Sequence, residues 1–155
     1  MFIDFLALAL LVLVIGLAMV ALYFAHYINN KPKNVAPGML LAGFIGFVLG
    51  LYIIFTWPLP SSYNIAFGEP LVLFGALLFG TGLAIIREWD LVSLGVFAFL
   101  AGIVAIIVGV RLINLQMTKE PLISGLGYIF TGLSGVLYLP AYLTRERPLL
   151  RYHPR

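Results

Sequence analysis

Five long apolar stretches occupy most of this chain and leave little sequence for anything else. A helix needs about 20 apolar residues to cross a hydrocarbon layer of about 30 Å. The stretches run over residues 2–25, 39–57, 70–86, 91–113 and 122–143. We therefore expect an all-α integral membrane protein with a bundle of five transmembrane helices at 1–143, followed by a basic tail at 144–155.

Composition supports this class. The chain is 63% hydrophobic and only 10% charged, whereas roughly a quarter of the residues in soluble domains are charged. A soluble core of 155 residues cannot hide so much apolar surface from water. The absence of cysteine excludes disulfides, thiolate nucleophiles and iron–sulfur ligation. The lipid bilayer is therefore the expected surroundings of the chain.

The third stretch is short for a membrane span. We expect residues 58–67 before it to form an external loop, and a shallow re-entrant loop is the alternative because Ile65, Ala66 and Phe67 are apolar. The first stretch lacks the positive segment that opens a signal peptide, so we expect it to stay as a helix.

Basic residues predict the orientation. Seven lie on the side of the first connection, the third connection and the tail: Lys31, Lys33, Arg87, Arg145, Arg147, Arg151 and Arg155. Only Arg111 and Lys119 lie opposite. The positive-inside rule then places the amino terminus outside and the carboxyl terminus in the cytoplasm, in the plasma membrane. The tail is either this topology signal or a site for anionic headgroups or a cytoplasmic partner.

An internal repeat could organise the bundle as one helix plus two repeated hairpins. The segment Glu69, Pro70, Leu71, Val72 matches Glu120, Pro121, Leu122, Ile123 at an offset of 51 residues. Proline suits the first turn of a helix, so each Glu-Pro pair is expected to open one. Chance explains these matches about as well.

Small residues recur at helical spacing in three stretches. They are Ala42, Gly46 and Gly50, then Ala101, Ala105 and Gly109, then Gly127, Thr131 and Gly135. Such stripes let helix backbones approach closely inside a membrane, within one chain or between subunits. The alternative, that glycines line a conduction path, is less common.

The sharpest functional signal is a one-sided polar set near Arg111. Its candidate ligand-binding residues are Arg111, Asn114, Glu69, Asn64, Tyr63 and Trp57, with Asp4 and Glu120 as further ion-pair partners at the same level. In one interpretation Arg111 reaches the headgroups or pairs with Glu69. In the other it holds an anionic ligand in an outward-facing pocket, with Asn114, Asn64 and Tyr63 as hydrogen-bond donors and Trp57 as a wall.

Other chemistry lacks the residues it needs. His26 and His153 fall outside the apolar stretches and have no third donor beside them, so we expect no metal and no cofactor. No phosphate-binding glycine loop is present, and the serines have no histidine on their side to act as a base. We expect neither an enzyme nor a nucleic-acid-binding protein.

Two segments carry a resemblance. FTWPLPSSYNIAFGEP, residues 55–70, and GVRLINLQMTKEPLISGLG, residues 109–127, resemble an uncharacterised family of small archaeal and bacterial multi-pass membrane proteins, classed as a domain of unknown function. The resemblance covers nearly the whole chain. It implies a multi-pass membrane protein and assigns no role to any residue.

Two functions from different classes remain. In the first, the chain forms a homo-oligomer that binds or transports a small anionic or polar solute from an outer vestibule. In the second, it is a non-catalytic accessory or assembly subunit of a larger membrane complex, held by its small-residue stripes.

Overall fold

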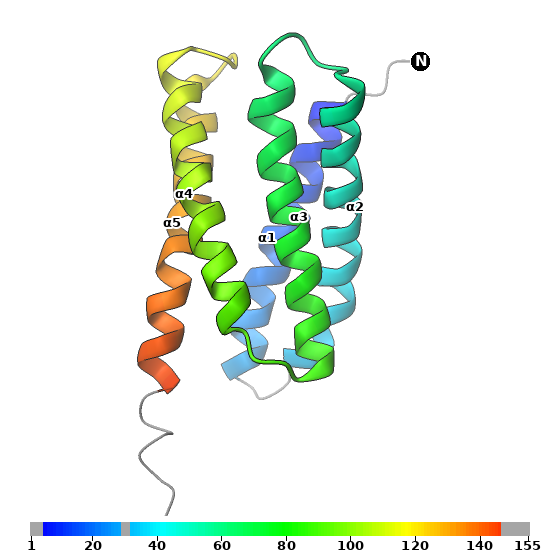
Figure 1. Cartoon of the computed structure of the whole chain (residues 1–155), viewed down its shortest axis with the longest axis vertical. Coiled ribbons are helices and arrows are strands. Elements are labelled where there is room, and N and C mark those ends of the chain that lie inside the picture. Colours follow the sequence, from blue (N-terminus) through cyan, green and yellow to red (C-terminus); the bar gives the residue numbers. More distant parts are fainter. Residues whose placement is uncertain (1–4, 29–31, 147–155) are drawn as a thin grey trace, which may run out of the picture. The chain divides into compact units, whose positions relative to one another are not determined.

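The computed structural model describes residues 5–28 and 32–146, which form five α-helices and one short 3-10 helix (Figure 1). The elements are α1 (Phe5–Ile28), η1 (Pro32–Val35), α2 (Ala36–Thr56), α3 (Tyr63–Arg87), α4 (Val92–Asn114) and α5 (Pro121–Glu146). All five α-helices are long and apolar enough to cross a membrane, as predicted. Which terminus lies outside stays a prediction, and Asp4, the side chain of His26 and residues 147–155 lie outside the described residues.

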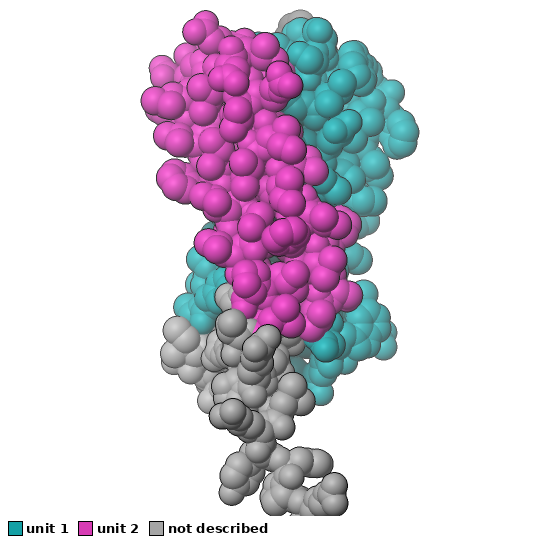
Figure 2. All heavy atoms as spheres, turned by 60° about the vertical axis from the view of Figure 1, so that its left-hand side comes forward, with its two compact units in different colours: residues 1–90 teal, residues 91–155 magenta. Residues whose placement is uncertain are grey.

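The helices belong to two compact units, Met1–Asp90 and Leu91–Arg155, which Figure 2 shows in different colours. The first contains α1, η1, α2 and α3, and the second contains α4 and α5. The single five-helix bundle stays a prediction. Large apolar side chains are exposed along all five helices, as suits contact with lipid.

Glycines set the distance between α2 and α3. A Cβ atom on Gly43 would lie 2.3 Å from the backbone nitrogen of Phe79, and one on Gly75 would lie 2.3 Å from that of Phe47. The same close approach recurs seven residues away, where a Cβ on Gly50 would lie 3.0 Å from the carbonyl oxygen of Gly68. The two helix backbones are therefore in direct contact, which only glycine permits at these positions.

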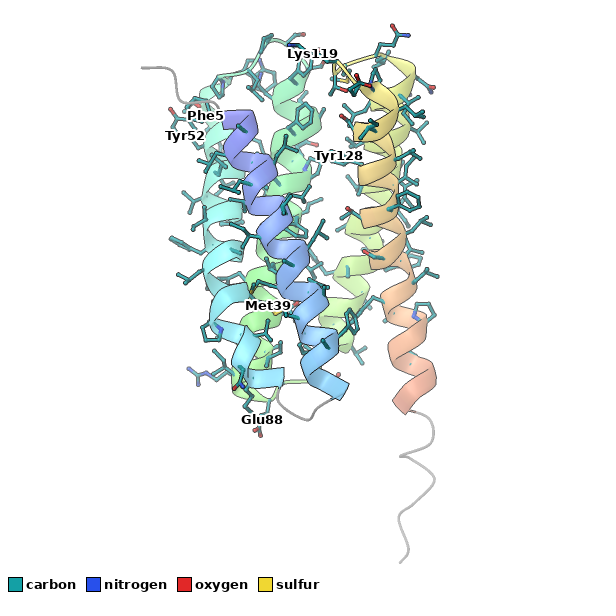
Figure 3. All side chains as sticks on the ribbon, turned by 180° about the vertical axis from the view of Figure 1, so that it is seen from behind. Phe5, Met39, Tyr52, Glu88, Lys119 and Tyr128 are labelled. Atoms are coloured by element: carbon teal, nitrogen blue, oxygen red, sulfur yellow. The ribbon has the colours of Figure 1, made fainter. Side chains whose placement is uncertain are left out.

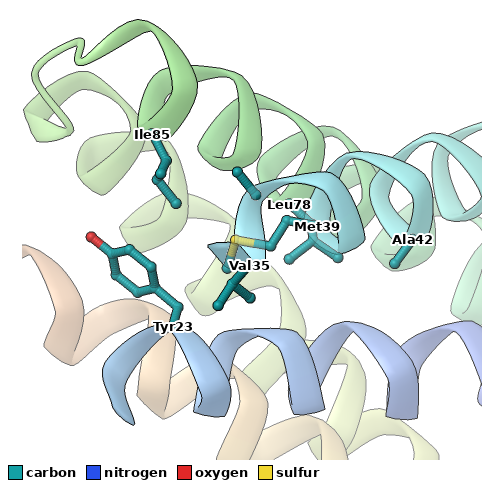
Figure 4. Packing of buried hydrophobic residues seen from close by; sticks show 7 residues of the cluster. Tyr23, Val35, Met39, Ala42, Leu78 and Ile85 are labelled. Carbon is teal, nitrogen blue, oxygen red and sulfur yellow. The ribbon is translucent and has the colours of Figure 1, made fainter. Parts of the chain in front are cut away.

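Helix α1 packs on this pair through apolar side chains. Two clusters of buried residues lie between α1, η1, α2 and α3. The larger contains Tyr23, Val35, Ala36, Met39, Ala42, Leu78 and Ile85, most of which Figure 4 labels. The smaller contains Ala9, Leu49, Ile53 and Leu71. At one end of the unit the ring of Phe5 lies 5.1 Å from that of Tyr52, so α1 and α2 are antiparallel (Figure 3).

The second unit repeats the glycine contact in a hairpin of α4 and α5. A Cβ on Gly102 or on Gly132 would lie 2.5 Å from the carbonyl oxygen of the other. Seven residues along, a Cβ on Gly109 or on Gly125 would lie 2.7 Å from the opposite carbonyl oxygen. Both hairpins thus bring their helices together at glycines spaced by seven residues on each helix, and an internal duplication stays a prediction.

Two expectations about the third span were wrong. Helix α3 begins at Tyr63, so its 25 residues make a full span and only residues 57–62 separate it from α2. Glu69 and Pro70 consequently lie inside α3, whereas Pro121 opens α5 as predicted. The Glu-Pro pairs therefore occupy different places in the two hairpins. Proline is tolerated inside a transmembrane helix because neighbouring groups re-satisfy the backbone.

Candidate functional site

The α2–α3 connection is a tight turn that begins at Trp57. This residue adopts the left-handed conformation (φ 51°) and its N–H donates to the carbonyl oxygen of Ile53 at 3.1 Å, which ends α2. Ser61 is also left-handed (φ 48°), and the Tyr63 N–H donates to the carbonyl oxygen of Pro60 at 3.2 Å. The indole of Trp57 is half exposed, as expected of an aromatic residue at a membrane interface.

Asn64 holds this turn together from the inside. It is completely buried, and its Oδ1 accepts a hydrogen bond from the Leu59 N–H at 2.8 Å. Its Nδ2 donates to the carbonyl oxygens of Leu59 and Ser61, the latter at 2.9 Å. Both amide hydrogens and the amide oxygen are thus occupied by backbone groups, so we assign Asn64 to the loop and not to a ligand.

Tyr63 precedes Asn64 on α3, and Glu69 follows it five residues later. The Tyr63 ring stacks on that of buried Phe67 with 6.1 Å between centroids and 10° between planes. Glu69 follows almost two turns after Tyr63, and its side chain is exposed. Of the candidates in the first unit, Trp57, Tyr63 and Glu69 are therefore the ones whose side chains reach its surface.

Arg111 and Asn114 lie at the end of α4, on the side turned away from α5. Gly102 and Gly109 mark the face of α4 that contacts α5, and Arg111 is two and a half turns beyond Gly102, so it points the opposite way. Both side chains are exposed. Within the described part of the second unit, no side chain lies within hydrogen-bond or ion-pair distance of the Arg111 guanidinium.

The α4–α5 connection is ordered by its own hydrogen bonds. Gln116 is left-handed (φ 49°), and the Met117 N–H donates to the carbonyl oxygen of Leu112 at 3.2 Å. The Thr118 hydroxyl donates to that of Ser124 at 3.1 Å, which ties the connection to the first turn of α5. Exposed Lys119 and Glu120 follow, so a second positive charge lies close to Arg111 in sequence.

One contact at the other end of the first unit was not predicted from the sequence. Lys33 of η1 and Glu88, the left-handed residue that caps α3, form an exposed ion pair. The hydrogen bond from Lys33, and then its positive charge, lower the pKa of Glu88 below its usual value. The sequence predicted only that Lys33 and Arg87 lie on the same side of the membrane.

The candidate residues are thus divided between the units. Trp57, Tyr63, Asn64 and Glu69 belong to the first and Arg111, Asn114 and Glu120 to the second. A direct pairing of Arg111 with Glu69 stays a prediction.

The five apolar helices and the polar residues at their ends define an α-helical membrane protein. The chain belongs to the family described as protein of unknown function (DUF981), whose family model matches residues 1–153. The resemblance to a domain of unknown function is thereby confirmed. No curated protein and no solved structure matches the chain.

Proposed function

We propose that this protein binds a small anionic or polar solute at an outward-facing vestibule, as an oligomer in the plasma membrane. The observation that carries the proposal is the exposed Arg111 guanidinium, which faces away from α5 and has no partner in the described part of its own unit. A charge inside a membrane helix costs about 2.5–3.5 kcal/mol at the helix centre, so one near the end still favours a partner or the interface.

The neighbours of Arg111 suit an anion. Asn114, three residues further, lies on an adjacent part of the same helix surface and can donate from its amide. Lys119 adds a second positive charge in the following connection. In the predicted topology, in which successive spans cross the membrane in alternate directions, the Trp57–Ser62 and Leu115–Glu120 connections belong to the same membrane side. The proposal is for binding or transport, without catalysis.

An anion-induced stability shift in detergent tests this proposal. Chloride, acetate and phosphate are compared with gluconate at constant ionic strength, in the unmodified protein and in Arg111→Gln. A ligand at tenfold over its Kd stabilises the folded state by about 1.4 kcal/mol, and this gain should vanish in the variant. Arg87→Gln, which removes an exposed arginine from the last turn of α3, is the matched control. Equal shifts in Arg111→Gln and the unmodified protein would exclude Arg111 as the binding group.

The competing interpretation is a structural pair between Arg111 and Glu69. A double-mutant cycle separates it from anion binding, because the coupling energy belongs to the pair. If the pair exists, Arg111→Glu combined with Glu69→Arg should recover much of the stability lost in either single change. Recovery without any anion effect would favour the structural pair.

A second candidate function, an accessory or assembly subunit, is supported by one face of α5. A Cβ atom on Gly127 would have nothing within 4 Å, unlike those on Gly125 and Gly132. Thr131 and Ser134 lie beside it, and their hydroxyls already donate to helix carbonyl oxygens at 2.8 and 2.7 Å. The face therefore needs no water and suits close contact with another helix. The native mass of the purified protein, together with any co-purifying subunit, distinguishes this role from a homo-oligomer.

A further inference from the structure

Glu69 lies deeper in its helix than its sequence context suggests. The midpoints of α1, α2 and α3 fall at Gly16, Gly46 and Gly75 by residue number. These three positions also meet in space: a Cβ on Gly46 would lie 3.5 Å from the Cα of Gly75, and one on Gly16 would lie 2.6 Å from Phe74. The centre of the first unit is therefore fixed by packing as well as by helix length.

Glu69 is six residues from Gly75, which corresponds to about 9 Å along the helix axis. Half the hydrocarbon thickness of a bilayer is about 15 Å. A membrane centred on the three glycines would therefore hold the Cα of Glu69 about 6 Å inside its apolar layer. The packing of α3 on α2 also places Glu69 inside the span. Gly68, which precedes Glu69, lies opposite Gly50, and α2 continues beyond Gly50 as far as Thr56.

Among the described residues of the first unit, no positively charged side chain lies near this carboxyl group. Its described basic side chains, Lys33 and Arg87, lie at the far end of the unit, and Lys33 is paired with Glu88. The elements packed on α3 near Glu69 contribute apolar residues, among them Ala9, Leu49 and Ile53. The titratable side chains described at this end are Tyr52, whose ring packs on Phe5, and Tyr63, whose ring stacks on Phe67.

Glu69 also lies on a face of α3 that neither neighbour covers. Gly68 and Gly75 face α2, while Phe74 and Leu78 face α1. The Glu69 side chain points away from both sets and is exposed. Ionised carboxylates are expensive in an apolar layer and occur there at ion or proton pathways. We propose that Glu69 is a membrane-embedded proton-binding site, neutral when protonated and open to exchange from the Trp57 side.

A hydrophobic carbodiimide tests the protonated state directly. Dicyclohexylcarbodiimide partitions into the apolar layer and takes the proton of a neutral carboxyl group while the carboxyl oxygen bonds to its central carbon. The resulting O-acylisourea rearranges to a stable N-acylurea that retains every atom of both partners, so peptide mass spectrometry locates the adduct. The full-length protein is labelled in native membranes from acidic to alkaline pH.

The expected result is an adduct at Glu69 that weakens as the pH rises and is lost in Glu69→Gln. Glu88 and Glu120, which lie outside the spanning helices, are internal controls and should react only with a water-soluble carbodiimide and an added amine. An unlabelled Glu69, or equal labelling of Glu88 and Glu120, would overturn the proposal. Labelling of Glu69 only in Arg111→Gln would overturn it as well, because Arg111 would then be the partner of an ionised Glu69.

Discussion

Asn64 and Arg111 are both polar side chains near the ends of apolar helices, and their surroundings give them different tasks. The Asn64 amide is buried and bonded to the backbone of Leu59 and Ser61. The Arg111 guanidinium is exposed and unpaired within the described part of its unit. A satisfied buried amide fixes a local conformation, whereas an exposed charge beside apolar surface is available for a ligand.

Replacing Asn64 by alanine should destabilise the protein. The change leaves the Leu59 N–H and carbonyl group without their partner in a partly buried turn, at a cost of about 1–3 kcal/mol. Asn34→Ala, at an exposed position in η1, is the matched control and should stay within about 0.5 kcal/mol. Thermal unfolding in detergent measures both. Equal melting temperatures for the two variants would show that the turn does not depend on Asn64.

The Lys33–Glu88 pair predicts that stability depends on pH in the acidic range. Because the pKa of Glu88 is lowered in the folded protein, the contribution of the pair to the free energy of unfolding is present above the ordinary glutamate pKa of about 4.3. It is lost as the pH falls through the folded value. Lys33→Gln should raise the pKa of Glu88 towards the ordinary value, measured by NMR of its side-chain carboxyl carbon. Lys119→Gln, a matched change in another connection, should leave that pKa unchanged.

Local sequence predicted some of the important residues but not the contacts between residues that are distant along the chain. The apolar stretches around Arg111 and Trp57 were enough to identify both as unusual positions near helix ends. The role of Asn64 depends on a turn that closes in three dimensions, and Lys33 and Glu88 are 55 residues apart. No local pattern encodes either contact.

At the scale of elements, glycine spacing decides which helix faces meet. The sequence stripes at spacing four included Gly109 and Gly135, which do contact the opposite helix, but also Gly127, which does not contact α4. The contacts follow a spacing of seven, through Gly102 with Gly132 and Gly109 with Gly125. In each stretch the small residues can be grouped at a spacing of four or at a spacing of seven. The sequence pattern alone therefore could not show which helix face contacts the neighbouring helix.

Gly109→Leu and Gly127→Leu should therefore differ. A side chain at Gly109 meets the carbonyl oxygen of Gly125 and the side chains of Tyr128 and Ile129, so the hairpin must open, at a cost of about 1–3 kcal/mol or more. A side chain at Gly127 meets open space and should leave the melting temperature of the monomer unchanged. If Gly127 forms an assembly face, the second variant should instead reduce the native mass. Equal destabilisation by both would contradict the assigned register.

The start of α3 is the helix boundary that the sequence predicted least well. Four stretches gave helix bounds within about three residues of those observed, while the third was begun at Pro70 instead of Tyr63. Proline is common in the first helical turn, and that preference concealed seven preceding helical residues. The same error placed Glu69 at the membrane surface.

For the whole molecule, the seven-to-two charge bias predicts topology. A reporter fused after Arg155 should behave as cytoplasmic and one inserted at Ser62 as external, because the positive-inside rule acts on both. Enzymatic reporters that fold on one membrane side only make the measurement. An external signal after Arg155 together with a cytoplasmic one at Ser62 would reverse the orientation and move Arg111 to the inner side.

Sided cysteine labelling at position 115 tests the proposed outer anion site most directly. The chain contains no cysteine, so Leu115→Cys introduces a single thiol at an exposed position four residues from Arg111 and leaves Asn114 in place. In sealed right-side-out vesicles an impermeant, negatively charged thiol reagent should modify it. Chloride or phosphate should slow that reaction relative to gluconate at equal ionic strength, and Arg111→Gln should remove the protection. Modification from the cytoplasmic side alone, or a rate that no anion changes, would contradict an outward-facing site built on Arg111.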